Sequence, residues 1–215
     1  MEVTVIQSRA LEFLLCKLRD VRTNQRDFAM YGDRAMRILA EEALCRLPNI
    51  VEKDIKTPCG IVKGLVEEDN AGKLCVVSIV RSGDILQEAV RQISPGVKLG
   101  KILIQRDETH VDKIPIFLYD KYPKDISTCF VILTDPMLAT AGSATLAIKM
   151  LLDKGVQESN ILFLNLICAP EGLDVLRNNF PRIRVLTGAI DKYLNEEKFI
   201  VPGLGDYGDR YSGTG

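Results

Sequence analysis

Apolar residues in the first third of the chain recur at the spacing of helices. The first stripe follows Ser8, a residue type that caps helix N-termini, and consists of Leu11, Leu14, Leu15 and Leu18. A second stripe predicts a helix over 27–47 that ends before Pro48. Residues 50–66 then indicate two short strands around a turn at 57–60, which reads Thr-Pro-Cys-Gly.

The middle of the chain has a different pattern, in which short aliphatic runs show no alternation with polar residues. Such runs are typical of strands buried on both faces. They cover 75–80, 101–104, 130–133 and 161–167, and a further strand is predicted over 183–187. Helices are predicted over 84–93, 143–154 and 171–179. Buried strands that alternate with helices predict an α/β fold with an open, mostly parallel sheet flanked by helices.

The length of 215 residues fits one domain spanning 1–215. The alternating pattern places its core at about 73–190. Residues 1–72, with the predicted helices and hairpin, and residues 191–215 do not follow this rhythm. We therefore expect them to form an accessory hood lobe beside the core.

Composition excludes several classes of function. The net charge is −1, from 28 basic and 29 acidic residues, and gives no field that would attract nucleic acid or an anionic membrane. The six cysteines show no metal-ligand spacing and His110 is the single histidine, which argues against a zinc site. Cysteines within apolar runs, no signal-peptide pattern and no long apolar span predict a cytoplasmic protein.

The segment 134–144 follows the third buried strand and contains the most informative local chemistry. Asp135 precedes Pro136, small residues follow, and a helix begins near Ser143. Ligands of open α/β sheets bind at this edge, where a helix start offers free amide groups to phosphate. A carboxylate can accept hydrogen bonds from two vicinal hydroxyls, so the pattern points to a ribose 5-phosphate. The same spacing also fits a strand end at Asp135 and a helix cap at Ser143 with no ligand.

Four motifs, in order, resemble those of uracil phosphoribosyltransferases. Residues 135–143 (DPMLATAGS) look like the family's loop for 5-phosphoribosyl 1-diphosphate (PRPP), and residues 200–210 (IVPGLGDYGDR) resemble its uracil loop. Residues 80–83 (VRSG) and 105–108 (QRDE) are similar to its two arginine segments. The resemblance runs from about residue 20 to the end and implies the type I phosphoribosyltransferase fold.

The resemblance implies transfer of phosphoribosyl from PRPP to uracil, which yields UMP and diphosphate in pyrimidine salvage. The implied catalytic residues are Asp135 and Arg106. The implied PRPP-binding residues are Arg81, Arg106, Asp135, Pro136, Met137, Leu138, Ala139, Thr140, Ala141, Gly142, Ser143 and Asp206. The implied uracil-binding residues, which act largely through main-chain groups, are Ile200, Gly205, Asp206 and Tyr207.

The resemblance also implies partners. Mg²⁺ is expected as a cofactor carried by PRPP, with no protein side chain as a metal ligand. A homodimer or homotetramer is expected, and some family members are activated by GTP. Arg81 and Arg106 would hold diphosphate oxygens, although a surface ion pair is the alternative for each. The polar segment 107–113, which contains His110, is expected as a lid over the diphosphate.

The 134–144 segment differs from the family pattern at position 141. Position 141 is Ala where the family usually has Gly, which would cost about 1 kcal/mol if that residue needs a positive φ. Position 134 is Thr, so the loop carries one acid.

Two other functions are alternatives. The same fold could act on orotate or a purine, although the segment 200–210 argues against that. A nucleotide sensor that binds UMP and regulates RNA is a second alternative, which the lack of a basic face disfavours.

Overall fold

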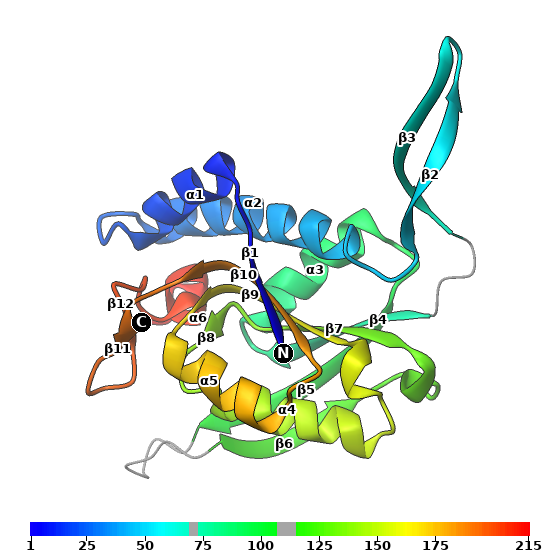
Figure 1. Cartoon of the computed structure of the whole chain (residues 1–215). Helices are drawn as coiled ribbons and strands as arrows, with labels where there is room; N and C mark the ends of the chain where they lie inside the picture. The colour runs from blue at the N-terminus through cyan, green and yellow to red at the C-terminus, as the bar shows by residue number, and fades with distance from the viewer. Residues whose placement is uncertain (69–72, 107–114) are drawn as a thin grey trace.

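The computed structural model describes residues 1–68, 73–106 and 115–215, and only the main chain of Arg106. Its central feature is an eight-stranded sheet with the order β1-β10-β9-β7-β4-β5-β6, in which β8 also pairs with β9 (Figure 1). The strands are β1 (Glu2–Val5), β4 (Leu74–Val80), β5 (Lys98–Arg106), β6 (Pro115–Lys121), β7 (Phe130–Thr134), β8 (Met137–Leu138), β9 (Ile161–Cys168) and β10 (Arg184–Ile190). All described pairs in it are parallel except β5 with β6, which confirms the predicted fold class.

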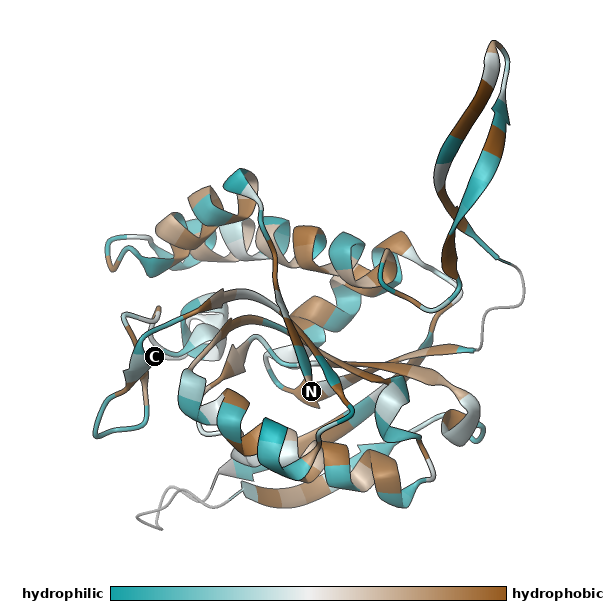
Figure 2. Ribbon diagram, in the orientation of Figure 1, coloured by the Kyte–Doolittle hydropathy of each residue, from teal (hydrophilic) through white to brown (hydrophobic). Residues whose placement is uncertain are grey.

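Helices cover both faces of this sheet because successive side chains of the central strands point to opposite sides. Val76, Ile132 and Leu164 pack under α1 (Arg9–Arg19), α2 (Gln25–Leu44) and α3 (Gly83–Ile93). Val77 and Phe163 pack on the other face with α4 (Gly142–Asp153) and α5 (Pro170–Asn179). Figure 2 shows the resulting hydrophobic colour of the central strands. Two 3₁₀ turns, Ile126–Thr128 and Glu158–Asn160, precede β7 and β9.

The N-terminal segment adds a strand to the main sheet that was not predicted. β1 joins the main sheet, where Val3 and Val5 pair in parallel with Val185 and Thr187 of β10. The predicted helices are present, and Ser8 Oγ accepts a hydrogen bond from Leu11 N as the N-cap of α1. They pack on the sheet itself and share its core. β1 was not predicted because it is a four-residue edge strand whose partner, β10, lies near the other end of the chain.

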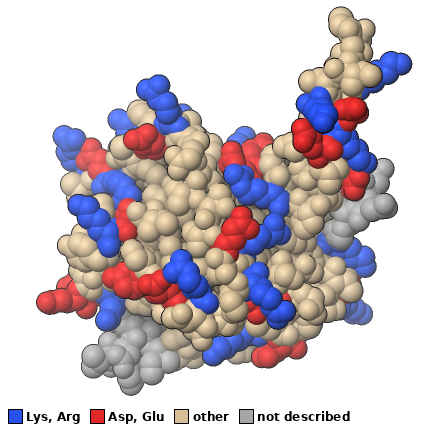
Figure 3. All heavy atoms as spheres, viewed as in Figure 1, with Lys and Arg blue, Asp and Glu red and all other residues tan. Residues whose placement is uncertain are grey.

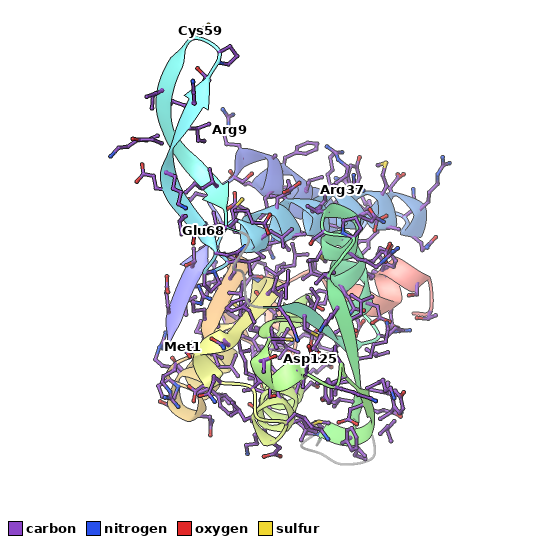
Figure 4. All side chains as sticks on the ribbon, turned by 90° about the vertical axis from the view of Figure 1, so that its right-hand side faces the viewer. Met1, Arg9, Arg37, Cys59, Glu68 and Asp125 are labelled. Carbon is purple, nitrogen blue, oxygen red and sulfur yellow. The ribbon has the colours of Figure 1, made fainter. Side chains whose placement is uncertain are left out.

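The predicted strands at 50–66 form a hairpin of β2 (Ile50–Thr57) and β3 (Gly60–Glu67), which pair with each other in a sheet of their own. The hairpin projects from the body at the side opposite α6 and the β11–β12 pair (Figure 1). Figure 4 shows Cys59 at its tip and Glu68 at its base. Exposed Ile61 and Leu65 lie on this hairpin, where the central sheet does not cover them.

The C-terminal segment contains the short pair β11 (Tyr193–Leu194) and β12 (Ile200–Val201), followed by α6 (Tyr207–Ser212). Leu204 and Tyr207 are buried, so this segment is packed against the rest of the chain. On the face shown in Figure 3, basic and acidic side chains are interspersed. No helix within the described ranges has the length and apolar character to cross a membrane.

Candidate active site

A cleft of about 610 Å³ opens at the carboxyl edge of the central strands. Two segments that are far apart in sequence line it: the 135–143 loop and the C-terminal residues 197–209. The lining residues are Ile79, Val80, Ser82, Ile104, Asp135, Met137, Ala139, Ser143, Glu197, Lys198, Phe199, Ile200, Gly205, Asp206, Tyr207, Gly208 and Asp209. This volume lies within the usual range for small-molecule sites.

The sheet holds the 135–143 loop by main-chain hydrogen bonds. Asp135 N donates to Leu164 O at 3.2 Å, and the carbonyl of Pro136 accepts from two amides of β9. Ala169 N donates to Leu138 O at 2.9 Å. Alternate side chains therefore face opposite ways, with Asp135, Met137 and Ala139 in the cleft and Leu138 in the core. Of the predicted loop residues, Pro136, Leu138, Thr140, Ala141 and Gly142 do not line the cleft.

The start of α4 closes this loop in a conformation that favours glycine. Ala141 is the N-cap residue, with φ +64° and ψ +11°, and its carbonyl accepts from Thr145 N at 2.8 Å. Ala141 therefore has the positive φ at which alanine was predicted to be less stable than glycine. No side chain in the described part of the chain caps α4, so Ser143 is not the cap. Ser143 lies inside the first turn and lines the cleft, where the first amides of the helix favour an anion.

The carboxylate of Asp135 lies in the cleft between the loop and α3. Ser82 Oγ lies 3.5 Å from Asp135 Oδ1, a long contact for a hydrogen bond. Thr134 is fully buried and its hydroxyl donates to Gly83 O at 3.0 Å. The loop thus presents a single carboxylate at the strand end, that of Asp135, while the hydroxyl of Thr134 ties the strand to the start of α3.

Side-chain anchors hold the C-terminal wall of the cleft. Tyr207 is buried, lies edge-on to Phe28 at 5.3 Å between ring centroids and stacks with Tyr211 at 5.9 Å. A Cβ added at Gly32 would lie 2.5 Å from Tyr207 Oη, so α2 closes around this ring. Burial raises the pKa of Tyr207 well above its ordinary value. Its side chain therefore anchors α6 as a neutral group, and its main chain is what remains near the cleft.

The predicted diphosphate ligand Arg81 follows β4 and bridges to the C-terminal segment. Its Nη2 lies 2.7 Å from Asp209 Oδ1, and its Nη1 donates to Thr214 Oγ1 at 3.0 Å. The Arg81 guanidinium, followed by the Thr214 hydroxyl that donates to Asp209 Oδ1 at 2.7 Å, lowers the pKa of Asp209. Arg81 is half-exposed, so the pair contributes little to stability. Arg81 does not itself line the cleft, but its partner Asp209 does, and both Arg81 and the carboxylate of Asp206, the N-cap of α6, lie beside Gly208.

Part of the predicted site lies outside the described residues. Arg106 ends β5 and its side chain is not described, and the expected lid at 107–113, with His110, falls in the undescribed range 107–114. Conversely, the cleft includes Glu197, Lys198 and Asp209, which were not predicted as site residues. Asp209 lies within residues 200–210, which resemble the uracil loop, so the sequence did offer a reason to include its carboxylate in the site. Nothing in the sequence pattern of 197–198 indicated a role.

A second cleft of about 680 Å³ lies at the base of the hairpin and contains none of the predicted site residues. It is lined by Leu47, Ile50, Glu67, Lys73 and Phe130, among others, at the amino ends of β4 and β7. Ligands of open α/β sheets bind at the carboxyl edge, so the cleft at Asp135 is the stronger candidate.

Similarity to known proteins identifies the family of this chain. The family model "Uracil phosphoribosyltransferase" matches residues 5–214. The chain is 46% identical to the uracil phosphoribosyltransferase of Dictyostelium discoideum, over 99% of this chain and 96% of that one, and 45% identical to that of Saccharomyces cerevisiae, over 95% and 93%. The AQ2163 protein of Aquifex aeolicus superposes with a TM-score of 0.82 at 25% identity, over 99% and 98% of the two chains. The chain belongs to the uracil phosphoribosyltransferase family.

Proposed function

We infer that this chain transfers the phosphoribosyl group of PRPP to uracil in pyrimidine salvage, giving UMP and diphosphate. The observation that carries this function is that one cleft is lined by both the 135–143 loop and the segment 200–209. The two segments with the longest family resemblance therefore face the same space. A sugar phosphate and a base must meet in such a space for a bond to form between them.

The 5-phosphate is proposed to bind at the start of α4, against the amides and hydroxyl of Ser143 and its neighbours. Support comes from the uncapped helix start within the described structure and from the small side chains beside it. Asp135 would then lie under the ribose and accept hydrogen bonds from its hydroxyls. As the bond from ribose C1 to diphosphate breaks, positive charge grows on the sugar, and the carboxylate stabilises it.

Uracil is proposed to bind against main-chain groups of Ile200, Gly205, Asp206 and Tyr207. All four line the cleft, and the buried ring of Tyr207 leaves its backbone as the part that can reach a ligand. Uracil presents an acceptor, a donor and an acceptor along one edge, which matches peptide N–H and C=O groups. Cytosine would leave such groups unpaired, and that mismatch can lower reactivity by a factor on the order of 10⁴.

The diphosphate is proposed to contact Arg81 and Arg106. Arg81 already uses two of its N–H groups on Asp209 and Thr214, but a guanidinium has five donors and can hold a second anion. Arg81 thereby links the leaving group to the segment proposed to bind uracil. The role of Arg106 rests on the family resemblance and on its place at the end of β5.

The charge of the cleft fits a magnesium ion that arrives with PRPP. Its described lining carries one lysine and four carboxylates, which are Asp135, Glu197, Asp206 and Asp209. No three His, Cys, Asp or Glu side chains of the described residues cluster as a metal site. Diphosphate and ribose oxygens would therefore supply most ligands, and the bound ion would neutralise charge on the leaving group. We expect chelation with EDTA to abolish turnover without unfolding the chain.

The decisive experiment measures diphosphate release from PRPP with uracil, cytosine, orotate, adenine or no base, in the presence of Mg²⁺. We expect release with uracil and formation of UMP, with little release from the other mixtures. Turnover with orotate or a purine instead of uracil would assign the cleft to another base. No release with any base would contradict an enzyme function.

We also propose that the chain forms a homodimer or homotetramer, with the hairpin as part of the contact. Ile61 is 75% exposed and Leu65 is 65% exposed on an arm that stands away from the body (Figure 4). Exposed apolar groups on such an arm are typical of association surfaces. Light scattering of the wild type and of Ile61→Lys tests this, with a smaller particle expected for the variant.

Two further proposals rest on the family alone. GTP as an effector is tested by turnover with and without GTP at subsaturating PRPP, with an increase expected if it activates this chain. A cytoplasmic location is tested by fractionating cells that express the chain and assaying turnover in each fraction.

A further inference from the structure

An ion pair ties the C-terminal segment to the end of α1 at a point behind the cleft wall. Arg19 Nη2 lies 2.6 Å from Asp191 Oδ1, and Arg19 Nη1 lies 2.7 Å from Asp191 Oδ2. Asp191 is 8% exposed, so the carboxylate is largely withdrawn from water. Two parallel contacts of this kind fix the relative orientation of guanidinium and carboxylate as well as their distance.

Both members of this pair also hold the main chain of one residue, Gly203. Gly203 N donates to Asp191 Oδ2 at 2.8 Å, and Arg19 Nη1 donates to Gly203 O at 2.7 Å. The N–H and the C=O of Gly203 are thus both fixed by charged groups. The three residues form a closed network, which we call the Arg19–Asp191 clamp.

Gly203 transmits this constraint to the proposed base-binding groups. Its φ is +58°, and a Cβ at this position would lie 2.0 Å from Ile200 O, so the backbone of Gly203 is packed directly on that carbonyl. Gly205 follows two residues later, also with a positive φ of +80°. Ile200 and Gly205 line the cleft, whereas Arg19, Asp191 and Gly203 are absent from the described residues that line it.

We propose that Arg19 and Asp191 are positioning residues that set the main chain of 200–205 and thereby the affinity and selectivity for uracil. This inference rests on the proposed function and adds two residues to it that touch no substrate. A charged pair withdrawn from water is a weak source of stability compared with apolar packing. The pair fixes the positions of main-chain groups in 200–205, and fixed positions are required where main-chain groups bind a base.

The test measures kcat and both KM values for the wild type, Arg19→Lys and Asp191→Asn. Lysine keeps the charge but has no planar fork that could hold both carboxylate oxygens and Gly203 O together. Asparagine keeps the shape but loses the charge. We expect KM for uracil to rise about tenfold or more while KM for PRPP stays within twofold, and the preference for uracil over cytosine to fall.

The matched control is Arg22→Lys. Arg22 forms a similar two-contact pair with Asp20, at 2.8 and 3.0 Å, with its own side chain 86% exposed, and no hydrogen bond or ion pair of the described residues joins Arg22 to segment 200–205. Its KM for uracil should equal that of the wild type. A tenfold rise of KM for uracil in Arg22→Lys would show that replacing an arginine near the segment is enough to cause the effect. That result would overturn the specific role of the clamp.

The outcomes separate the possible failures. If both KM values rise together, or if only kcat falls along with the thermal midpoint, the pair is a structural support and the positioning role is wrong. If neither variant folds, the pair is needed for folding and the positioning role is again wrong. A wild type that does not use uracil at all overturns the proposed function itself, before any variant is compared.

Discussion

The two walls of the cleft are held in place by different kinds of interaction. The 135–143 loop is fixed by main-chain hydrogen bonds to β9, which any sequence with the same backbone could make. The segment 200–210 is fixed by side-chain contacts. Asp191 pairs with Arg19 of α1, Arg210 donates to the carbonyl of Asp20 at the end of α1, and Tyr207 packs on Phe28 of α2. Substitutions in the first wall should therefore change chemistry more than structure. Substitutions at the anchors of the second should change base affinity, with a loss of stability as well where the anchor is Arg210.

The largest expected effect is in the first wall. Asp135→Asn removes the negative charge proposed to face the growing positive charge on the ribose, and should lower kcat on the order of 10²-fold. The backbone bonds of the loop do not involve this carboxylate, so the urea midpoint should stay unchanged. Steady-state kinetics and urea unfolding are both needed. An unchanged kcat would remove Asp135 from the mechanism.

The second effect is in the other wall. The Arg210 guanidinium donates to the carbonyls of Leu18, Leu204 and Asp20 and lies over the ring of Phe28. Arg210→Ala leaves these carbonyls without that donor and should cost roughly 2–3 kcal/mol of unfolding free energy. KM for uracil should rise as the segment loosens. If the variant kept wild-type stability and KM, the difference drawn between the two walls would be wrong.

A smaller effect is expected at the start of α4, and it has the opposite sign. Ala141 has a φ of +64°, where glycine has no steric penalty. Ala141→Gly should raise the free energy of unfolding by up to about 1 kcal/mol, with the loop in the same place. Urea unfolding measures the gain, and KM for PRPP reports any shift of the loop. A loss of stability would show that packing of the buried Ala141 methyl outweighs the backbone cost.

The smallest effect concerns the thiols beside each wall. Cys168 pairs with Leu138 under the loop, and burial raises its pKa to about 11 from 9.0. A raised thiol pKa means a contribution to stability that is full below pH 9 and is lost as pH rises through about 11. At pH 8 we expect iodoacetamide to label exposed Cys16 and spare Cys168. In urea-unfolded protein, iodoacetamide should label both Cys16 and Cys168. Equal labelling rates of the two thiols in the folded protein would show that the 135–143 loop opens readily.

The sequence allowed prediction of the elements whose cause is local. The aliphatic runs of β4, β7 and β9 and the stripe of α1 depend on residues a few positions apart, and the structure contains them with small shifts of their ends. Edge strands β1 and β6 were missed because the alternation in β1 covers four residues only and β6 has no alternation. Asp135 was identified because strand end, proline and helix start follow one another directly. Lys198 and the clamp residues carried no such local signal.

The amino-acid pattern alone determined the open parallel sheet, the carboxylate at the end of its central strand and the small residues before α4. Periodicity and turn chemistry act over a few residues, so one sequence is enough to find them. Only the tertiary structure decided that Arg19 meets Asp191, that Arg210 reaches Leu18, and that 200–209 faces 135–143 across one cleft. Those contacts join residues far apart along the chain, and burial and packing, rather than spacing, select them.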